Sequence, residues 1–131
     1  IRALRGEGVP ITATAVYSQI QAFMAMQAGA NYIAPYFNRM ENLDIDPRKT
    51  IAAIRQFIDE AGSDSKILAA SFRNMAQVTG ALLAGAQSVT VQPKLLHDAL
   101  GMAAIARAVE DFKRDWTDVR GDVSIADLAD A

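Results

Sequence analysis

The strongest constraint on this chain is the alternation of short apolar segments with helical segments that end at glycine. Runs of small and β-branched residues predict four strands, over residues 11–16, 31–35, 66–70 and 88–91. Apolar residues at helical spacing predict helices over 1–5, 18–28, 46–61, 75–84 and 101–118, with short helices after Pro93 and Ser124. Strands that alternate with helices need crossover connections, so the pattern predicts a parallel sheet.

An internal repeat narrows the fold further. Residues 25–33 and 81–89 share one pattern, in which a helix ends at Gly29 or Gly85 and a strand follows. Repeated joints of this kind favour an α/β barrel of similar units, although a doubly wound open sheet also fits the pattern. Four strands are too few to close such a barrel. We therefore expect a fragment, a partner of another chain, or a self-associating half-barrel.

The composition excludes several function classes. The formal net charge is −2 and Lys and Arg are not clustered, which argues against nucleic acid as a partner. No apolar run approaches the roughly 20 residues of a membrane span, and no signal peptide is visible, so we expect a cytoplasmic protein without membrane contact. The chain has no cysteine, and His97 is its single histidine. Neither a multi-histidine metal site nor a Ser-His-Asp triad is available, and no cofactor is expected.

Charged and hydroxyl side chains gather where the predicted strands end, which is where parallel α/β folds bind ligands. Arg39 follows the second strand, and Ser71 and Arg73 follow the third. Two guanidinium groups, a hydroxyl and a helix that begins near Asn74 can together bind a phosphate group. The plainer alternative has equal weight: both arginines form surface ion pairs and Ser71 caps the helix.

Three more polar residues, Thr14, Tyr36 and Asn38, lie near the same strand ends. Their side chains can orient a water molecule or a substrate hydroxyl for proton transfer. From the residues alone, Thr14 is equally well explained as a strand former and Tyr36 as a half-buried aromatic.

Several segments together resemble the transaldolase and fructose-6-phosphate aldolase family, over about Glu7 to Trp116. The segments are Gly-Val-Pro-Ile-Thr-Ala-Thr-Ala-Val-Tyr at 8–17, Ala-Gly-Ala-Asn-Tyr-Ile-Ala-Pro-Tyr-Phe-Asn-Arg at 28–39, Leu-Ala-Ala-Ser-Phe-Arg at 68–73 and Leu-Ala-Gly-Ala-Gln-Ser-Val-Thr at 83–90. The resemblance implies a (β/α)₈ barrel, of which this chain supplies about the last four β/α units. It also implies cleavage or transfer of a dihydroxyacetone unit from a ketose phosphate through a Schiff-base lysine.

The resemblance also implies a role for each site residue. Arg39, Ser71 and Arg73 would bind the phosphate of the sugar, and Thr14 and Tyr36 would hold the catalytic water, with Asn38 in support. With tyrosine at position 36, the chain resembles the aldolase-like branch of the family, since transaldolases usually carry phenylalanine there.

The Schiff-base lysine of the family has no counterpart in this sequence. The lysines are Lys49, Lys66, Lys94 and Lys113, and none has the Lys-Val/Ile-Pro setting of the family. We therefore expect the isolated chain to be inactive and its lysine to lie upstream of Ile1. The expected partners are sugar phosphates and either further copies of the chain or a complementary N-terminal half-barrel. Residues 1–118 would form the half-barrel, and 119–131 a tail helix that exchanges with a neighbouring subunit. The alternative is a noncatalytic half-barrel that binds a phosphorylated ligand or self-assembles.

Overall fold

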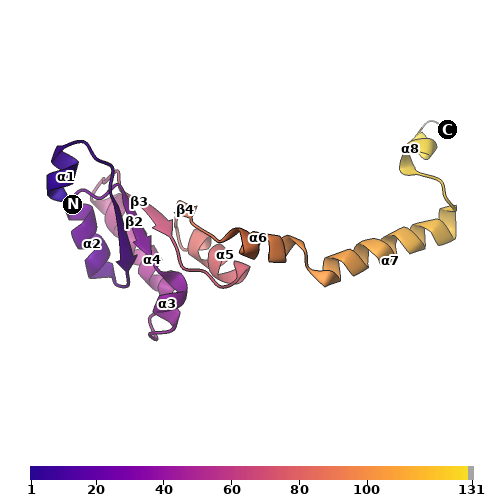
Figure 1. Cartoon of the computed structure of the whole chain (residues 1–131), viewed down its shortest axis with the longest axis horizontal. Helices are drawn as coiled ribbons and strands as arrows, with labels where there is room; N and C mark the ends of the chain where they lie inside the picture. The colour runs from indigo at the N-terminus through magenta and orange to yellow at the C-terminus, as the bar shows by residue number, and fades with distance from the viewer. Residues whose placement is uncertain (130–131) are drawn as a thin grey trace. The chain divides into compact units, whose positions relative to one another are not determined.

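The computed structural model describes residues 1–129, which form two units, Ile1–Leu96 and the segment that starts at His97. The elements of the first unit are α1 (Arg2–Gly6), β1 (Thr12–Val16), α2 (Gln19–Gln27), β2 (Tyr32–Pro35), α3 (Phe37–Glu41), α4 (Pro47–Glu60), β3 (Lys66–Ala69), α5 (Met75–Leu83) and β4 (Ser88–Val89) (Figure 1). The remaining elements are α6 (Pro93–Leu100), α7 (Ala103–Arg120) and α8 (Ile125–Ala129). None of the helices in the described residues is long and apolar enough to cross a membrane.

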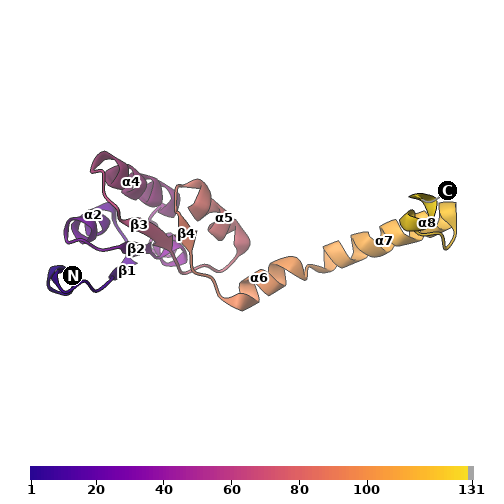
Figure 2. The same ribbon diagram turned by 90° about the horizontal axis from the view of Figure 1, so that it is seen from above.

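The four strands form one parallel sheet in the order β1-β2-β3-β4, which confirms the predicted parallel α/β architecture. Strand order follows chain order, whereas a doubly wound sheet reverses its order at a switch point. Helices α2, α4 and α5 lie side by side over one face of the sheet (Figure 2). All the carboxyl ends of the strands therefore meet along one edge.

The hydrophobic core of the first unit lies between the sheet and this helix layer. Ile33 of β2, Ile67 of β3 and Ile54 of α4 are buried in one apolar cluster. Their strand neighbours Tyr32 and Lys66 are exposed, because successive residues of a strand point to opposite faces. The face of the sheet opposite the helices is therefore much less covered than the core face.

Helix α4 begins as the sequence predicts. The Asp46 carboxylate accepts hydrogen bonds from the backbone N–H groups of Arg48 (3.0 Å) and Lys49 (3.1 Å), and Pro47 occupies the first helical position. The bond from the Lys49 N–H is the main cause that lowers the pKa of Asp46. The start of the helix is fixed in this way, and its buried residues Ile51, Ile54 and Ile58 form one side of the core.

The internal repeat has a structural counterpart at the amino ends of the strands. The N–H of Ile11 donates to Oδ1 of Asn31 (2.8 Å), and the N–H of Ile67 donates to Oε1 of Gln87 (2.8 Å). In each copy, a side-chain amide at the start of one strand holds the start of the strand before it. The repeat in the sequence is thus a repeat of tertiary hydrogen bonds.

Helix α3, which carries Asn38 and Arg39, was not predicted from the sequence. Both were expected directly after the second strand, and both lie there on this five-residue helix. The N–H groups of Phe37 and Asn38 donate to the carbonyl oxygens of Ala70 (2.9 Å) and Ser71 (2.8 Å). These bonds satisfy the start of a helix that has no side-chain cap.

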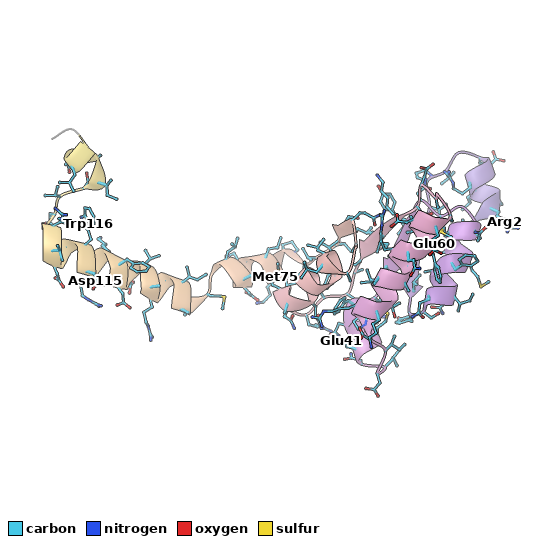
Figure 3. All side chains as sticks on the ribbon, turned by 180° about the vertical axis from the view of Figure 1, so that it is seen from behind. Arg2, Glu41, Glu60, Met75, Asp115 and Trp116 are labelled. Carbon is cyan, nitrogen blue, oxygen red and sulfur yellow. The ribbon has the colours of Figure 1, made fainter. Side chains whose placement is uncertain are left out.

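The second unit consists of the end of α6 with α7 and α8. Helix α7 has an apolar stripe of exposed side chains at Met102, Ile105, Val109 and Phe112. Near its end, Nε1 of Trp116 donates to the carbonyl of Val123 (2.7 Å) (Figure 3). Ser124 and Asp127 form the predicted capping box before α8, and the hydrogen bond from Ser124 lowers the pKa of Asp127. Residues 130 and 131 of the expected tail segment lie outside the described residues.

Replacing Ile67 with alanine tests the assignment of the two sheet faces. Ile67 is completely buried against the helices, so we expect Ile67→Ala to lower the free energy of unfolding by about 2–5 kcal/mol in urea denaturation. Leu68 is only partly buried on the other face, and Leu68→Ala should have a clearly smaller effect. Equal losses would contradict the assignment, since they would require the second face to be covered as well.

Candidate functional site

A cleft of about 520 Å³ lies at the carboxyl ends of β2, β3 and β4. Its walls are formed by side chains that follow these three strands: Tyr36, Arg39, Ala70, Ser71, Phe72, Arg73, Thr90, Val91, Gln92 and Pro93. The structure thus brings together Arg39, Ser71 and Arg73, the three residues expected to bind phosphate. They come from α3 and from the loop between β3 and α5.

The loop after β3 has an unusual backbone that presents Ser71 to the cleft. Ser71 has a positive φ of 65°, which a non-glycine residue rarely adopts. The cap of α5 is Asn74, whose Oδ1 accepts the N–H of Gln77 (2.9 Å). The alternative interpretation of Ser71 as the helix cap is therefore wrong. Its hydroxyl is not used to start the helix and lies beside the cleft.

The end of β1 and the residues that follow it repeat this backbone. Ala15 also has a positive φ, of 56°, and a β-bulge interrupts the pairing of β1 with β2 at this point. Ser18 caps α2, and Oε1 of Gln21 accepts the N–H of Tyr17 (2.8 Å). In the loop after β3, Oε1 of Gln77 accepts the N–H of Arg73 in the same way (2.7 Å). The two segments therefore place Tyr17 and Arg73 at equivalent positions of the repeat.

Two tyrosines hold Arg39 in place. Its Nη1 donates to the Tyr17 hydroxyl (3.3 Å), and its guanidinium lies 5.0 Å from the centre of the Tyr36 ring. The hydrogen bond with Tyr17 is the main cause that raises the pKa of Arg39. Among residues 1–129, neither Arg39 nor Arg73 forms an ion pair with a carboxylate. Their charges are therefore available to an anion.

The two residues expected to hold water are in direct contact. The Thr14 hydroxyl donates to the Tyr36 hydroxyl (2.9 Å), across the pair of strands β1 and β2. Thr14 is exposed and does not line the cleft itself, whereas Tyr36 does. The hydroxyl pair thus lies at one side of the cleft, on the side of β1.

Asn38 is placed differently from expectation. Its Oδ1 accepts a hydrogen bond from Nε2 of Gln77 (3.0 Å), and it does not line the cleft. Gln77 and Tyr17 were not among the site residues predicted from the sequence. The pattern Ser18-x-x-Gln21, repeated as Asn-x-x-Gln in the second copy, was the available signal.

No lysine and no histidine lines this cleft. Lys66 starts β3 at its amino end, and the other lysines lie on α4, α6 and α7. Residues 1–129 contain no group of three or more His, Asp or Glu side chains that could hold a metal ion. The cleft in this chain is suited to binding an anion and holding hydroxyl groups, and it has no amine nucleophile of its own.

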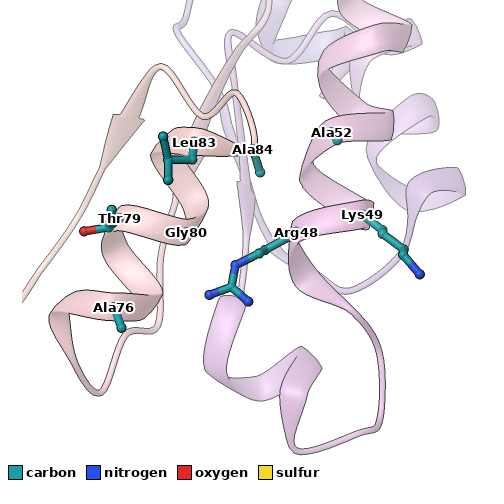
Figure 4. Close-up of a pocket in the computed structure, with 8 residues that line it drawn as sticks. All are labelled: Arg48, Lys49, Ala52, Ala76, Thr79, Gly80, Leu83 and Ala84. Atoms are coloured by element: carbon teal, nitrogen blue, oxygen red, sulfur yellow. The ribbon is translucent and has the colours of Figure 1, made fainter.

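A larger groove, of about 620 Å³, lies between α4 and α5 (Figure 4). Its walls are mostly small or apolar residues, with the polar groups of Arg48, Lys49 and Thr79 at its margin. Gly80 leaves room for the Arg48 side chain, because a Cβ at this position would lie 2.6 Å from the Arg48 Nε. The groove carries no set of converging polar groups, so the cleft at the strand ends is the better candidate.

The fold and the cleft define a parallel α/β protein with a cationic cleft at the carboxyl ends of its strands. Residues 1–123 match the family described as Transaldolase/Fructose-6-phosphate aldolase, and the chain belongs to this family. A probable fructose-6-phosphate aldolase of Streptococcus pneumoniae is 50% identical over 125 residues, which are 95% of this chain and 56% of that protein. The chain therefore spans little more than half the length of this relative.

Solved structures show the same fold at low sequence identity. An IMP dehydrogenase/GMP reductase-like protein of Corynebacterium glutamicum matches 69% of this chain with 28% of its own, at a TM-score of 0.53 and 24% identity. A putative phosphonomutase of Burkholderia cenocepacia matches 72% of this chain with 56% of its own, at a TM-score of 0.52 and 21% identity. Both are TIM-barrel proteins, which is the fold class that the alternating pattern favours.

The positive φ of Ser71 predicts which substitutions the loop tolerates. Ser71→Gly removes the hydroxyl but fits the backbone, so the free energy of unfolding should not fall. Ser71→Val places a β-branched side chain at a positive φ and should lower it by about 1–3 kcal/mol. Chemical denaturation measures both. Equal destabilisation by glycine and valine would show that the side chain, and not the backbone, sets the stability of this loop.

Proposed function

We propose that this chain is the phosphate-binding and water-positioning part of a class I aldolase or transaldolase that acts on ketose phosphates. The family and the relative support this class of activity. The single observation that carries the proposal is the cleft itself, where Arg39, Ser71 and Arg73 face one space and no carboxylate of residues 1–129 pairs with either arginine.

In the proposed mechanism, the two guanidinium groups bind the phosphate ester and so fix the sugar in the cleft. Charge-assisted hydrogen bonds suit this task because they are short and directional. The bound phosphate would also accept a hydrogen bond from the Ser71 hydroxyl. Holding the remote end of the substrate orients its reacting end, which contributes to the rate of the chemical step.

The hydroxyl pair of Thr14 and Tyr36 would hold the water that moves protons during carbon–carbon bond cleavage. Tyr36 is also close to a cation, since the Arg39 guanidinium lies over its ring. The tyrosine favours release of the dihydroxyacetone unit, as in an aldolase, over its transfer. The acidic and lysine groups of the reaction would come from outside this chain.

The proposed whole protein is a (β/α)₈ barrel, and these residues would be its last four β/α units. The sequential strand order and the single helix layer support this placement. The less covered sheet face would become the barrel interior. The segment 119–131, with the exposed stripe of α7, would pack on a neighbouring subunit of a homo-oligomer in the cytoplasm.

A second candidate is a noncatalytic half-barrel that binds a phosphorylated ligand or self-assembles. One observation favours it, namely that none of the four lysines of the chain lines the cleft. A nucleophilic amine is essential for Schiff-base chemistry. The two candidates share the phosphate site and differ in whether a lysine is supplied from elsewhere.

Removing either cationic group should weaken the binding of phosphorylated ligands. We expect Arg39→Ala and Arg73→Ala each to weaken binding of glyceraldehyde 3-phosphate roughly tenfold or more in calorimetry, because each removes a charge-assisted hydrogen bond. Binding of unphosphorylated glyceraldehyde should not change. Arg55→Ala is the matched control, since Arg55 pairs with Asp59 on α4, away from the cleft. Unchanged phosphate affinity in both cleft variants would reject the phosphate site.

Reductive trapping distinguishes the two candidates. Borohydride with fructose 6-phosphate should leave a stable adduct on a lysine in a protein that joins this chain to its N-terminal half-barrel. We expect peptide mass spectrometry to find no adduct on Lys49, Lys66, Lys94 or Lys113, and none at all on the isolated chain. An adduct on one of these four lysines would contradict the proposed division of the active site. No adduct on any lysine of the joined protein would favour the noncatalytic candidate.

A further inference from the structure

Gln77 is a buried polar residue whose hydrogen bonds join the two elements that carry the cationic groups of the cleft. Its side chain is on α5 and only 7% of the residue is exposed. Oε1 accepts the N–H of Arg73 (2.7 Å), and Nε2 donates to Oδ1 of Asn38 (3.0 Å) and to Oε2 of Glu41 (2.5 Å). The amide donates two hydrogen bonds and accepts one, and it thereby joins α3 to the loop that carries Arg73.

The partners of Gln77 place it between the two arginines. Asn38 and Glu41 lie on α3, which is also the helix of Arg39, and Figure 3 shows Glu41 on that helix. Arg73 is held directly through its backbone N–H. Neither Gln77 nor Asn38 lines the cleft, so this contact acts from behind the cleft wall.

Helix α3 needs such attachments because a five-residue helix is not stable alone. Its first turn is tied to the segment directly after β3, because the N–H groups of Phe37 and Asn38 donate to the carbonyl groups of Ala70 and Ser71. The Gln77 amide holds its last turn, at Glu41, as well as its middle. Phe37 and Met40 of this helix are also fully buried, so the Gln77 bonds are a further attachment, which ties the helix that carries Arg39 to α5 and to the Arg73 backbone.

We propose that Gln77 is a positioning residue that fixes the separation of the Arg39 and Arg73 guanidinium groups, and so sets the affinity of the cleft for a phosphate ester. This inference rests on the proposed phosphate site. Only an amide meets the requirement, since the position must accept one hydrogen bond and donate two. Its counterpart in the first repeat, Gln21, is exposed and accepts the N–H of Tyr17 alone.

Two variants separate positioning from general stabilisation. In Gln77→Glu, the carboxylate still accepts the Arg73 N–H but faces the Glu41 carboxylate, so the attachment of α3 is lost and one negative charge is added, which the second substitution removes again. Adding Glu41→Gln places an amide opposite the new carboxylate, so that position 41 donates and position 77 accepts. This reversed hydrogen bond should restore the attachment of α3 to α5. The control is Gln87→Met, which removes a bond of the same kind, to the Ile67 N–H, at the other end of β3.

The probes are inorganic phosphate and glyceraldehyde 3-phosphate in calorimetry, with unphosphorylated glyceraldehyde as the reference ligand and circular dichroism as the check of folding. Because misplaced charged groups bind poorly, we expect Gln77→Glu to weaken binding of both phosphate probes roughly tenfold. Binding of glyceraldehyde should stay unchanged. The double variant with Glu41→Gln should recover most of the loss, and Gln87→Met should bind as the parent does.

The outcomes also separate this inference from the proposed function. If Arg39→Ala weakens phosphate binding but a folded Gln77→Glu variant does not, the role of Gln77 is wrong and the phosphate site stands. If Gln77→Glu and Gln87→Met weaken binding equally, the amide acts only through stability and the inference fails. If the parent protein prefers neither phosphate probe over glyceraldehyde, the phosphate site is wrong and the inference falls with it.

Discussion

The cleft depends on the backbone hydrogen bonds that continue beyond the ends of the strands. The N–H of Tyr36 donates to the Val16 carbonyl of β1 (3.1 Å), and the N–H of Phe37 donates to the carbonyl of Ala70 after β3 (2.9 Å). The segment after β2 is therefore attached on both sides to its neighbours. Parallel strands bring these ends to one edge, and the extra bonds turn that edge into a rigid wall. Side chains on this wall need little further ordering to act together.

Much of this arrangement could be predicted because its causes are local or topological. The Asp46-Pro47 start of α4 needs only two residues, and the alternation of strands and helices is enough to predict parallel pairing. Once the strands are parallel, residues that follow different strands must meet. This is why Arg39, Ser71 and Arg73 could be grouped from the sequence although Arg39 lies far from the other two along the chain.

The remaining features depend on contacts between distant segments. Helix α3 has no side-chain cap, and the bonds that hold its first turn come from Ala70 and Ser71. Nothing near Phe37 in the sequence indicates them. The positive φ of Ser71 could not be predicted from the sequence either, because a serine just before a helix is usually its N-cap. Gln77 was overlooked for a similar reason, since its partners on α3 lie more than thirty residues away.

The repeat explains how one backbone design serves two purposes. The segment from the end of β1 to α2 and the loop from β3 to α5 share a residue at positive φ, a side-chain cap and a glutamine that holds a backbone N–H. They differ in the residue to which this N–H belongs, which is Tyr17 in the first segment and Arg73 in the second. The first segment therefore supplies a neutral hydroxyl that supports Arg39, while the second supplies a charge. Since like charges repel at short range, a tyrosine beside Arg39 supports this guanidinium with a hydrogen bond and without the repulsion that an arginine at the same position would add.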